Sequence, residues 1–187
     1  MRHLILLFTV HFFLFPVFGQ DISFYKENIT MKISNGYFYV TGYYYLETTG
    51  DRSVALVYPF PVDPFYGDPD SILVFNLTTD QPVDLLESKD EGVVFTAEFG
   101  EYSNELQLLI SYRQQLLQNQ AEYILESTAG WRSPLQQADY QLIVPKGMEI
   151  IDFSIPPDEV IQADEEKIYY WSRKDFMPRA NMIFEFR

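Results

Sequence analysis

Apolar and polar residues alternate in short runs through most of this sequence, and that alternation constrains the fold more than any other feature. The cleanest run covers residues 105–116, where four large apolar side chains would share one face: Leu106, Leu108, Ile110 and Tyr112. A period of two is that of a β-strand with one buried side. Gly, Pro, Asn and Asp separate the runs, and no long segment has the roughly 3.6-residue period of a helix. The pattern predicts an all-β fold and argues against a parallel α/β protein.

Roughly ten to twelve short strands can be placed from these runs, which favours an antiparallel two-sheet β-sandwich. The first two, at 29–33 and 37–48, flank Asn35-Gly36, a pair that tolerates the positive φ of a tight hairpin. Residues 59–69 are expected to form a proline-rich loop, and Ser133-Pro134 to begin a single helical turn. The remaining strands are expected at 54–58, 71–78, 83–87, 93–99, 105–116, 123–127, 140–144, 149–155, 167–172 and 182–186.

Residues 1–19 are predicted to be a signal peptide, and residues 20–187 a single β-sandwich domain. Met1-Arg2-His3 is followed by an apolar stretch from Leu4 to Phe18, and small residues suited to signal peptidase precede position 20. A stretch of about 15 residues is short for a membrane span, which needs about 20. An uncleaved membrane anchor is the alternative. We therefore expect a secreted or periplasmic protein.

Charge and composition remove several functional classes. Acidic residues outnumber basic ones by 27 to 13, giving a formal net charge of −14, which argues against nucleic acid as a partner. The chain has no cysteine, and both histidines, His3 and His11, fall within the predicted signal peptide. The exported chain would therefore lack Ser-His and Cys-His nucleophile pairs and imidazole metal ligands. Catalysis could rest only on carboxylates, Lys, Tyr or a Ser-Lys pair, and we expect no cofactor and, on balance, no enzyme.

Four tyrosines share one side of the strand predicted at 37–48: Tyr37, Tyr39, Tyr43 and Tyr45. The even positions of that strand are apolar apart from Gly42. If the even side meets the core, the tyrosines project from the opposite side, where flat rings with a polar hydroxyl suit recognition of a protein or a sugar. The alternative is that they pack against cross-strand neighbours or beneath a loop.

Two further places hold candidate site residues. Trp131 either plugs the end of the sandwich or lines a pocket with Arg132, whose guanidinium could hold an anionic group. Asp63, Asp68 and Asp70 could coordinate calcium, although their spacing does not match the twelve-residue calcium loop and Asp beside Pro and Gly is ordinary turn chemistry. Two glycosylation sequons begin at Asn28 and Asn76 and would matter only in a eukaryotic secretory pathway.

A succession of short motifs resembles secreted bacterial β-sandwich domains of unknown function. The motifs are YYL at 44–46, YPFP at 58–61, SYRQ at 111–114, YIL at 123–125, WRSPL at 131–135 and VP at 144–145. The resemblance covers most of residues 20–187. It implies a β-fold in the envelope or outside the cell, and it supplies no catalytic residues.

The leading hypothesis is an exported, non-catalytic domain that binds a protein or cell-surface polymer through the tyrosine face, or that acts in envelope assembly. Expected partners are envelope or extracellular proteins or polysaccharides, with no transmembrane segment after signal cleavage. The alternative is a carbohydrate-binding module or a carboxylate-based glycoside hydrolase with an acidic, aromatic cleft. A deep groove with facing carboxylates beside Trp131 or the tyrosine row would favour the alternative.

The signal-peptide assignment predicts a defined amino terminus. Protein purified from its native host should begin at Gln20, because cleavage is expected after Gly19. Amino-terminal sequencing or intact-mass measurement tests this. A product that still begins at Met1 and stays in the cytosol would contradict it.

Overall fold

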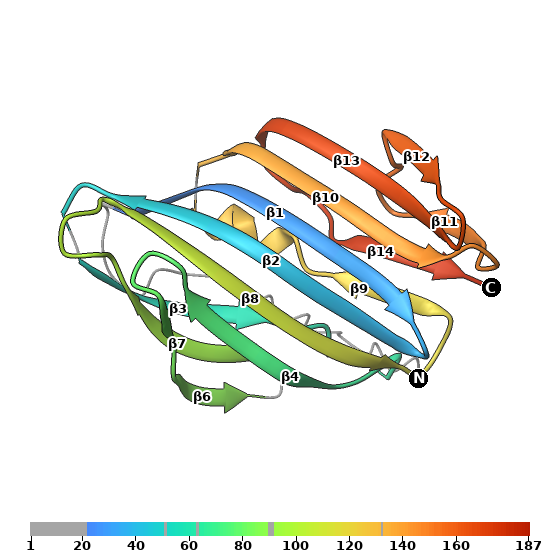
Figure 1. Cartoon of the computed structure of the whole chain (residues 1–187), viewed down its shortest axis with the longest axis horizontal. Coiled ribbons are helices and arrows are strands. Elements are labelled where there is room, and N and C mark those ends of the chain that lie inside the picture. Colours follow the sequence, from blue (N-terminus) through green and yellow to red (C-terminus); the bar gives the residue numbers. More distant parts are fainter. Residues whose placement is uncertain (1–21, 51, 63, 90–91, 132) are drawn as a thin grey trace, which may run out of the picture.

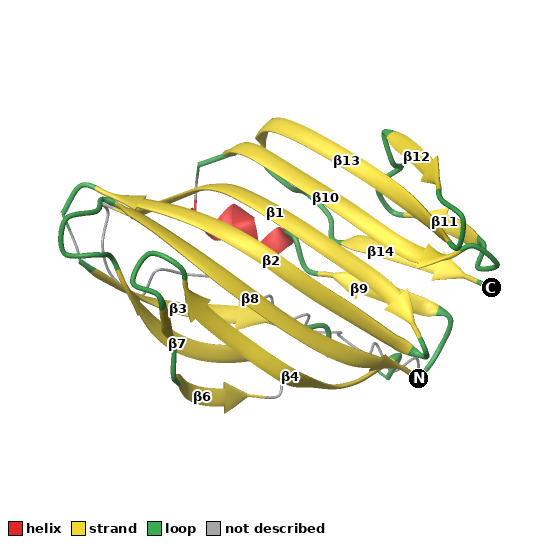
Figure 2. Ribbon diagram, in the orientation of Figure 1, coloured by secondary structure: helices red, strands yellow, loops and turns green. Residues whose placement is uncertain are grey.

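The computed structural model describes residues 22–187 except 51, 63, 90–91 and 132, so the predicted signal peptide lies outside the described residues. The described chain forms fourteen strands and one 3-10 helix (Figures 1 and 2). The elements are β1 (Ile22–Ser34), β2 (Tyr37–Thr48), β3 (Ser53–Pro59), β4 (Tyr66–Asn76), β5 (Gln81–Pro82), β6 (Leu85–Lys89), β7 (Gly92–Glu98), β8 (Glu105–Leu116), β9 (Gln120–Tyr123), η1 (Glu126–Trp131), β10 (Leu135–Pro145), β11 (Ile150–Phe153), β12 (Glu159–Gln162), β13 (Glu166–Phe176) and β14 (Met182–Phe186). Over these residues no helix is long and apolar enough to cross a membrane.

Eight strands form one large mixed sheet in the order β12-β13-β10-β1-β2-β8-β4-β5. Its neighbouring strands are antiparallel except β1 and β10, which run parallel. The predicted all-β class is confirmed, whereas the predicted antiparallel two-sheet sandwich is wrong. Alternation identifies a strand but carries no information about its partner or their relative direction, so the parallel pair could not be seen in the sequence.

Two three-stranded sheets, β3-β7-β6 and β11-β14-β9, cover different parts of the inner face of the large sheet (Figure 1). The Tyr44 ring of β2 lies 5.7 Å from the Tyr58 ring of β3. Near the start of β2, the Phe38 ring lies 6.3 Å from the Phe184 ring of β14. The hydrophobic core therefore fills the space between the large sheet and a second layer that is divided in two.

The tight hairpin between β1 and β2 is confirmed. Asn35 and Gly36 both have positive φ, 53° and 76°, and Ser34 pairs with Tyr37 directly before and after them. Two consecutive residues with positive φ match the right-handed twist of the flanking strands. The turn sets the register of β1 against β2, and with it which side chains face outward.

Three local predictions differ from the structure. The helical turn predicted at Ser133-Pro134 is wrong, because β10 begins at Leu135 and the helix of the described chain is η1 instead. The predicted loop over 59–69 is shorter, because β4 takes in Pro69 at a register shift, where a missing backbone donor is tolerated. Strand β12 was not predicted because all four of its residues are exposed, so it shows no alternation.

A bulge in β1 reverses which side of the strand faces the core. Phe24 pairs with Leu46 and Lys26 with Tyr45, which leaves Tyr25 as the extra residue. Buried residues therefore change from even positions, ending at Phe24, to odd positions, beginning at Glu27. The bulge places a carboxyl group inside the protein and turns Asn28 outward.

Gly42 makes room for an aromatic ring in the core. A Cβ at this position would lie 2.4–2.6 Å from the ring and hydroxyl of Tyr44, two residues along the same strand. The Tyr44 ring therefore lies back over Gly42. The gap in the apolar pattern of the sequence is a space that the next inward side chain fills.

Replacement of Gly42 by Ala should lower the free energy of unfolding by about 2 kcal/mol, because an overpacked core must displace the Tyr44 ring. Urea denaturation followed by tryptophan fluorescence measures this. Gly147→Ala is the matched control, since a Cβ there meets nothing within 4 Å. Equal unfolding midpoints for the two variants would contradict the assignment.

Candidate functional site

A groove of about 800 Å³ lies on the outer face of the large sheet. Strands β1, β2, β10, β12 and β13 build it, so its lining comes from segments more than a hundred residues apart in the sequence. The residues that line it are Asn28, Ile29, Thr30, Tyr43, Tyr45, Asp139, Tyr140, Gln141, Asp158, Glu159, Ile161, Tyr170, Trp171 and Ser172. The outward-facing residues among them are mainly polar, together with Tyr43, Tyr45 and Tyr170, so the groove suits a ligand that offers hydrogen bonds as well as flat surface.

Strand β1 runs along the middle of the groove. Asn28 pairs with Tyr43 of β2 on one side and with Asp139 of β10 on the other. One row further on, Thr30 pairs with Thr41 and with Gln141. Because side chains at paired positions project from the same face of a sheet, amide, hydroxyl and carboxyl groups gather in the middle of the groove.

Hydrogen bonds between side chains hold this polar surface in place. The Gln137 Nε2 and the Ser172 Oγ each donate to the Asp139 Oδ1 at 2.7 Å. The Gln141 Nε2 donates to the Thr30 Oγ1 at 2.6 Å. Polar side chains that are fixed before binding lose little conformational entropy when a ligand arrives.

Asp158 lies at the β12 side of the groove and has its own partners. Its Oδ2 accepts a hydrogen bond from the backbone N–H of Ser172 at 2.8 Å and forms an ion pair with Arg173. The hydrogen bond from the Ser172 backbone and the nearby Arg173 guanidinium lower the pKa of Asp158 below its ordinary value. This carboxyl is therefore ionised at neutral pH and its charge is already balanced.

All four predicted tyrosines project from the outer side of β2. The even positions of the strand are on the opposite side and face the core. Two of them are covered by cations. The Arg113 guanidinium lies 4.8 Å from the centre of the Tyr37 ring, and the Lys26 ammonium lies 4.7 Å from the centre of the Tyr45 ring. Tyr39 packs beside Tyr37, with ring centres 6.1 Å apart.

Tyr43 differs from the other three tyrosines of that row. It is 42 % exposed and lines the groove. Tyr170 of β13, which the sequence did not single out, lines the same groove from the far side of β1 and β10. The groove therefore contains one predicted tyrosine with an exposed ring, Tyr43. It also contains Tyr170, whose place in the groove depends on the order of strands in the sheet.

The other predicted site residues lie elsewhere. Trp131 is 9 % exposed in η1, beside a core cavity of about 20 Å³, and its neighbour Arg132 is outside the described residues, as is Asp63. Asp70 forms an ion pair with Arg113 at 2.5 Å. Among the described residues, no three His, Cys, Asp or Glu side chains gather as a metal site would require.

The two sequon asparagines have different surroundings. Asn76 is 3 % exposed, its Nδ2 donates to the Glu98 carbonyl oxygen at 2.7 Å, and its Oδ1 accepts from the backbone N–H groups of Thr78 and Thr79. Asn28 is partly exposed in the middle of the groove. Asn76 therefore has a structural role in the turn after β4.

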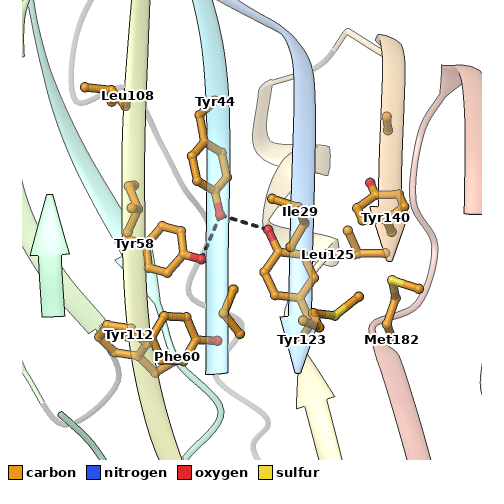
Figure 3. Close-up of a cluster of buried hydrophobic side chains, with 14 of the residues drawn as sticks. Ile29, Tyr44, Tyr58, Phe60, Leu108, Tyr112, Tyr123, Leu125, Tyr140 and Met182 are labelled. Atoms are coloured by element: carbon orange, nitrogen blue, oxygen red, sulfur yellow. Dashed lines mark hydrogen bonds between the residues drawn. The ribbon is translucent and has the colours of Figure 1, made fainter. Parts of the chain in front are cut away.

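A buried carboxyl lies on the inner side of β1, opposite the groove. Glu27 is 1 % exposed, and the Tyr140 hydroxyl donates to its Oε1 at 2.5 Å. Beside it, the Tyr44 hydroxyl lies 3.0 Å from the Tyr123 hydroxyl and 2.8 Å from that of Tyr58 (Figure 3). These five residues, which we call the tyrosine–carboxyl cluster, join the large sheet to both small sheets.

Burial controls the ionisation of the tyrosine–carboxyl cluster. Removal from water raises the pKa of Glu27 from 4.5 to about 7, against the opposing effect of hydrogen bonds from Tyr140 and Tyr123. Burial also raises the pKa of Tyr44 and Tyr123 well above 10, so both hydroxyls keep their protons. Glu27 was not predicted as a buried residue, although it lies two residues before Ile29, in phase with the apolar side of β1.

Comparison with known proteins gives a fold but no family. No protein-family model and no curated protein sequence matches the chain. A putative nutrient binding protein from Legionella pneumophila is similar in structure, with a TM-score of 0.72 and 12 % identity over 92 % of this chain and 68 % of that chain. An M1 zinc metallopeptidase from Deinococcus radiodurans has a TM-score of 0.52 and 7 % identity, over 89 % of this chain.

Neither similarity carries residue roles to this chain. Identities of 12 % and 7 % show a shared fold alone. The chain spans only 43 % of the metallopeptidase, whose whole activity therefore cannot be transferred to it. What these comparisons establish is a β-rich architecture found in a protein named for binding and in part of a larger enzyme.

The raised pKa of Glu27 predicts a specific pH dependence of stability. The unfolded chain ionises Glu27 from about pH 4.5 while the folded chain keeps it protonated up to about pH 7. The free energy of unfolding should therefore fall by about 3 kcal/mol between these two pH values. Above about pH 7, Glu27 should cause no further change. Glu27→Gln should remove this fall. The free energies of unfolding of the variant and the wild type are measured at pH 4.5 and at pH 8, and the difference between the two proteins should change between these pH values.

Glu165→Gln is the control for the Glu27 experiment, because Glu165 is exposed in the connection between β12 and β13. Its unfolding free energy should follow that of the wild type at every pH. A constant difference between Glu27→Gln and the wild type from pH 4.5 to pH 8 would show that the pKa of Glu27 is not raised by burial.

Proposed function

We propose that this chain is an exported binding domain that holds a protein segment or cell-surface polymer in the groove on the outer face of the large sheet, without catalysing a reaction. One observation carries the proposal: the groove of about 800 Å³ has a polar surface that is already fixed by its own hydrogen bonds. A prearranged surface of this size suits binding, because little ordering is left for the ligand to induce.

The position of the groove in the fold supports the proposal. Its middle lies over β1, an internal strand with hydrogen-bonded partners on both sides, and its side chains come from paired positions of a continuous sheet. Sites on strands are held more accurately than sites on loops. The similar Legionella protein, named for nutrient binding, also fits a binding role for a domain of this shape.

The structure changes how the tyrosine face would be used. Arg113 and Lys26 cover the rings of Tyr37 and Tyr45, so those two tyrosines contribute mainly to the order of the sheet surface. Tyr43 keeps an exposed ring inside the groove. The proposed contact surface is therefore Tyr43 together with the groove residues of β10 and β13, in place of the whole tyrosine row.

Carboxylates do line the groove beside a tyrosine, which is what a glycoside hydrolase would also require. A general acid needs a raised pKa, whereas the pKa of Asp158, a carboxyl group of the groove, is lowered. The carboxyl with a raised pKa, Glu27, lies on the inner side of the sheet and is 1 % exposed. Binding without hydrolysis is therefore the better-supported function.

The proposal predicts that Tyr43→Ala will lose ligands that the wild-type protein captures. Purified protein is immobilised and exposed to an extract of surface polymers and envelope proteins from the native host. Retained material should fall at least about fivefold for the variant, because an exposed aromatic contact in a groove is lost.

Tyr102→Ala is the matched control, because Tyr102 is 91 % exposed and does not line the groove. It should retain as much material as the wild type. Thermal melts of both variants show whether folding is preserved. Equal retention by wild type and Tyr43→Ala would exclude the groove as the binding surface.

A further inference from the structure

We infer that the groove binds a neutral oligosaccharide chain, laid across the strands between Tyr43 and Tyr170. This inference rests on the proposed function, because it names the ligand class of the same groove. It combines three observations: two tyrosines on opposite sides, a floor with unfilled hydrogen-bond acceptors, and a charge pattern that disfavours a polyanion.

The two tyrosines are spaced for an extended ligand. Tyr43 is on β2 and Tyr170 is on β13, with β1 and β10 between them. Three strand spacings separate them by roughly 14 Å across the sheet. Both belong to the outer face, since their neighbours Tyr44 and Trp171 are buried in the core. A tyrosine ring offers a flat apolar surface to the C–H face of a sugar and a hydroxyl to its edge.

The floor between the tyrosines has acceptors that the protein leaves open. The Asp139 Oδ1 takes both donors, from Gln137 and Ser172, and among the described residues no donor reaches its Oδ2. The Gln141 side chain donates through Nε2 to Thr30, which leaves its carbonyl oxygen without a described partner. Asn28 lies beside Asp139 on the neighbouring strand β1, and among the described residues its side-chain amide has no hydrogen-bond partner. Carboxylate and amide groups in this state match a ligand rich in hydroxyl donors.

The charges around the floor argue against an anionic polymer. Asp139 and Glu159 would repel a polyanion. The net charge of the whole chain, −14, adds to that repulsion. A polycation would gain less from Asp158, because Arg173 already balances that carboxylate, and it would meet the Lys26 ammonium over the Tyr45 ring at the groove. A neutral chain of hydroxyl groups avoids the repulsion and can use the open carboxylate and amide oxygens of the floor.

Binding of defined neutral oligosaccharides tests the inference. Maltohexaose, cellohexaose and chitohexaose are titrated into the protein by isothermal titration calorimetry, with octalysine and a polygalacturonate hexamer as cationic and anionic probes. At least one neutral hexamer should bind. Tyr43→Ala and Tyr170→Ala should each weaken its binding by about five- to tenfold, and Tyr102→Ala should leave it unchanged.

Gln141→Leu provides a second readout that stacking alone would not move. It keeps the approximate size of the side chain but removes both the Nε2 donor that fixes it to Thr30 and the carbonyl oxygen that would accept from the ligand. Affinity for the neutral hexamer should fall, with a smaller favourable enthalpy. Thermal melts confirm that each variant is folded.

The outcomes separate this inference from the proposed function. If all three neutral hexamers fail to bind, or if one binds equally to wild type, Tyr43→Ala and Tyr170→Ala, the inference is overturned. If octalysine binds in a Tyr43-dependent manner instead, the ligand class is wrong while the groove remains the binding surface. The proposed function itself fails only if capture from host extract is also independent of Tyr43.

Discussion

Pairing of β1 with β2 on one side and with β10 on the other is the interaction on which the rest of this structure depends. Through it a segment near the start of the described chain joins the next strand to a strand whose paired residues lie more than a hundred positions later. The inner side of β1 contributes Glu27 and apolar residues to the core, and its outer side contributes Asn28 and Thr30 to the groove. The bulge at Tyr25 sets which residues go to which side.

The two faces of the large sheet have opposite electrostatic character. On the inner side Glu27 is held among tyrosine hydroxyls with no cation from the described residues beside it, so burial disfavours its charged form. On the outer side Asp158 has Arg173 and a backbone donor, and its charged form is favoured. A single layer of β-sheet separates them. Acid–base chemistry and ligand contact are thereby kept apart, which is why we regard the groove as a binding surface.

Sequence patterns predicted the parts of the fold that depend on one strand at a time. The strand 105–116, the hairpin at Asn35-Gly36 and the outward direction of the tyrosines follow from alternation and turn chemistry. The parallel pairing of β1 with β10 does not, because it depends on the packing of the complete sheet. Strand β12 also gave no signal, since exposed residues on an edge strand need not alternate.

The candidate site was predicted only in part for the same reason. Tyr43 was named from the sequence, but its partners in the groove, Asp139, Gln141 and Tyr170, are distant along the chain and adjacent only in the sheet. The covering of Tyr37 by Arg113 likewise depends on the register between β2 and β8. The inward direction of Glu27 could have been predicted from the sequence, because it alternates in phase with Ile29 and Met31.

The surroundings of Asn76 and Asn28 define what a glycan at either sequon would do to this protein. A glycan on Asn76 would remove the amide from its bond to Glu98 and could not fit inside the closed turn. A glycan on Asn28 would fill the groove. The turn after β4 and the open groove therefore both require an unmodified asparagine at these two positions.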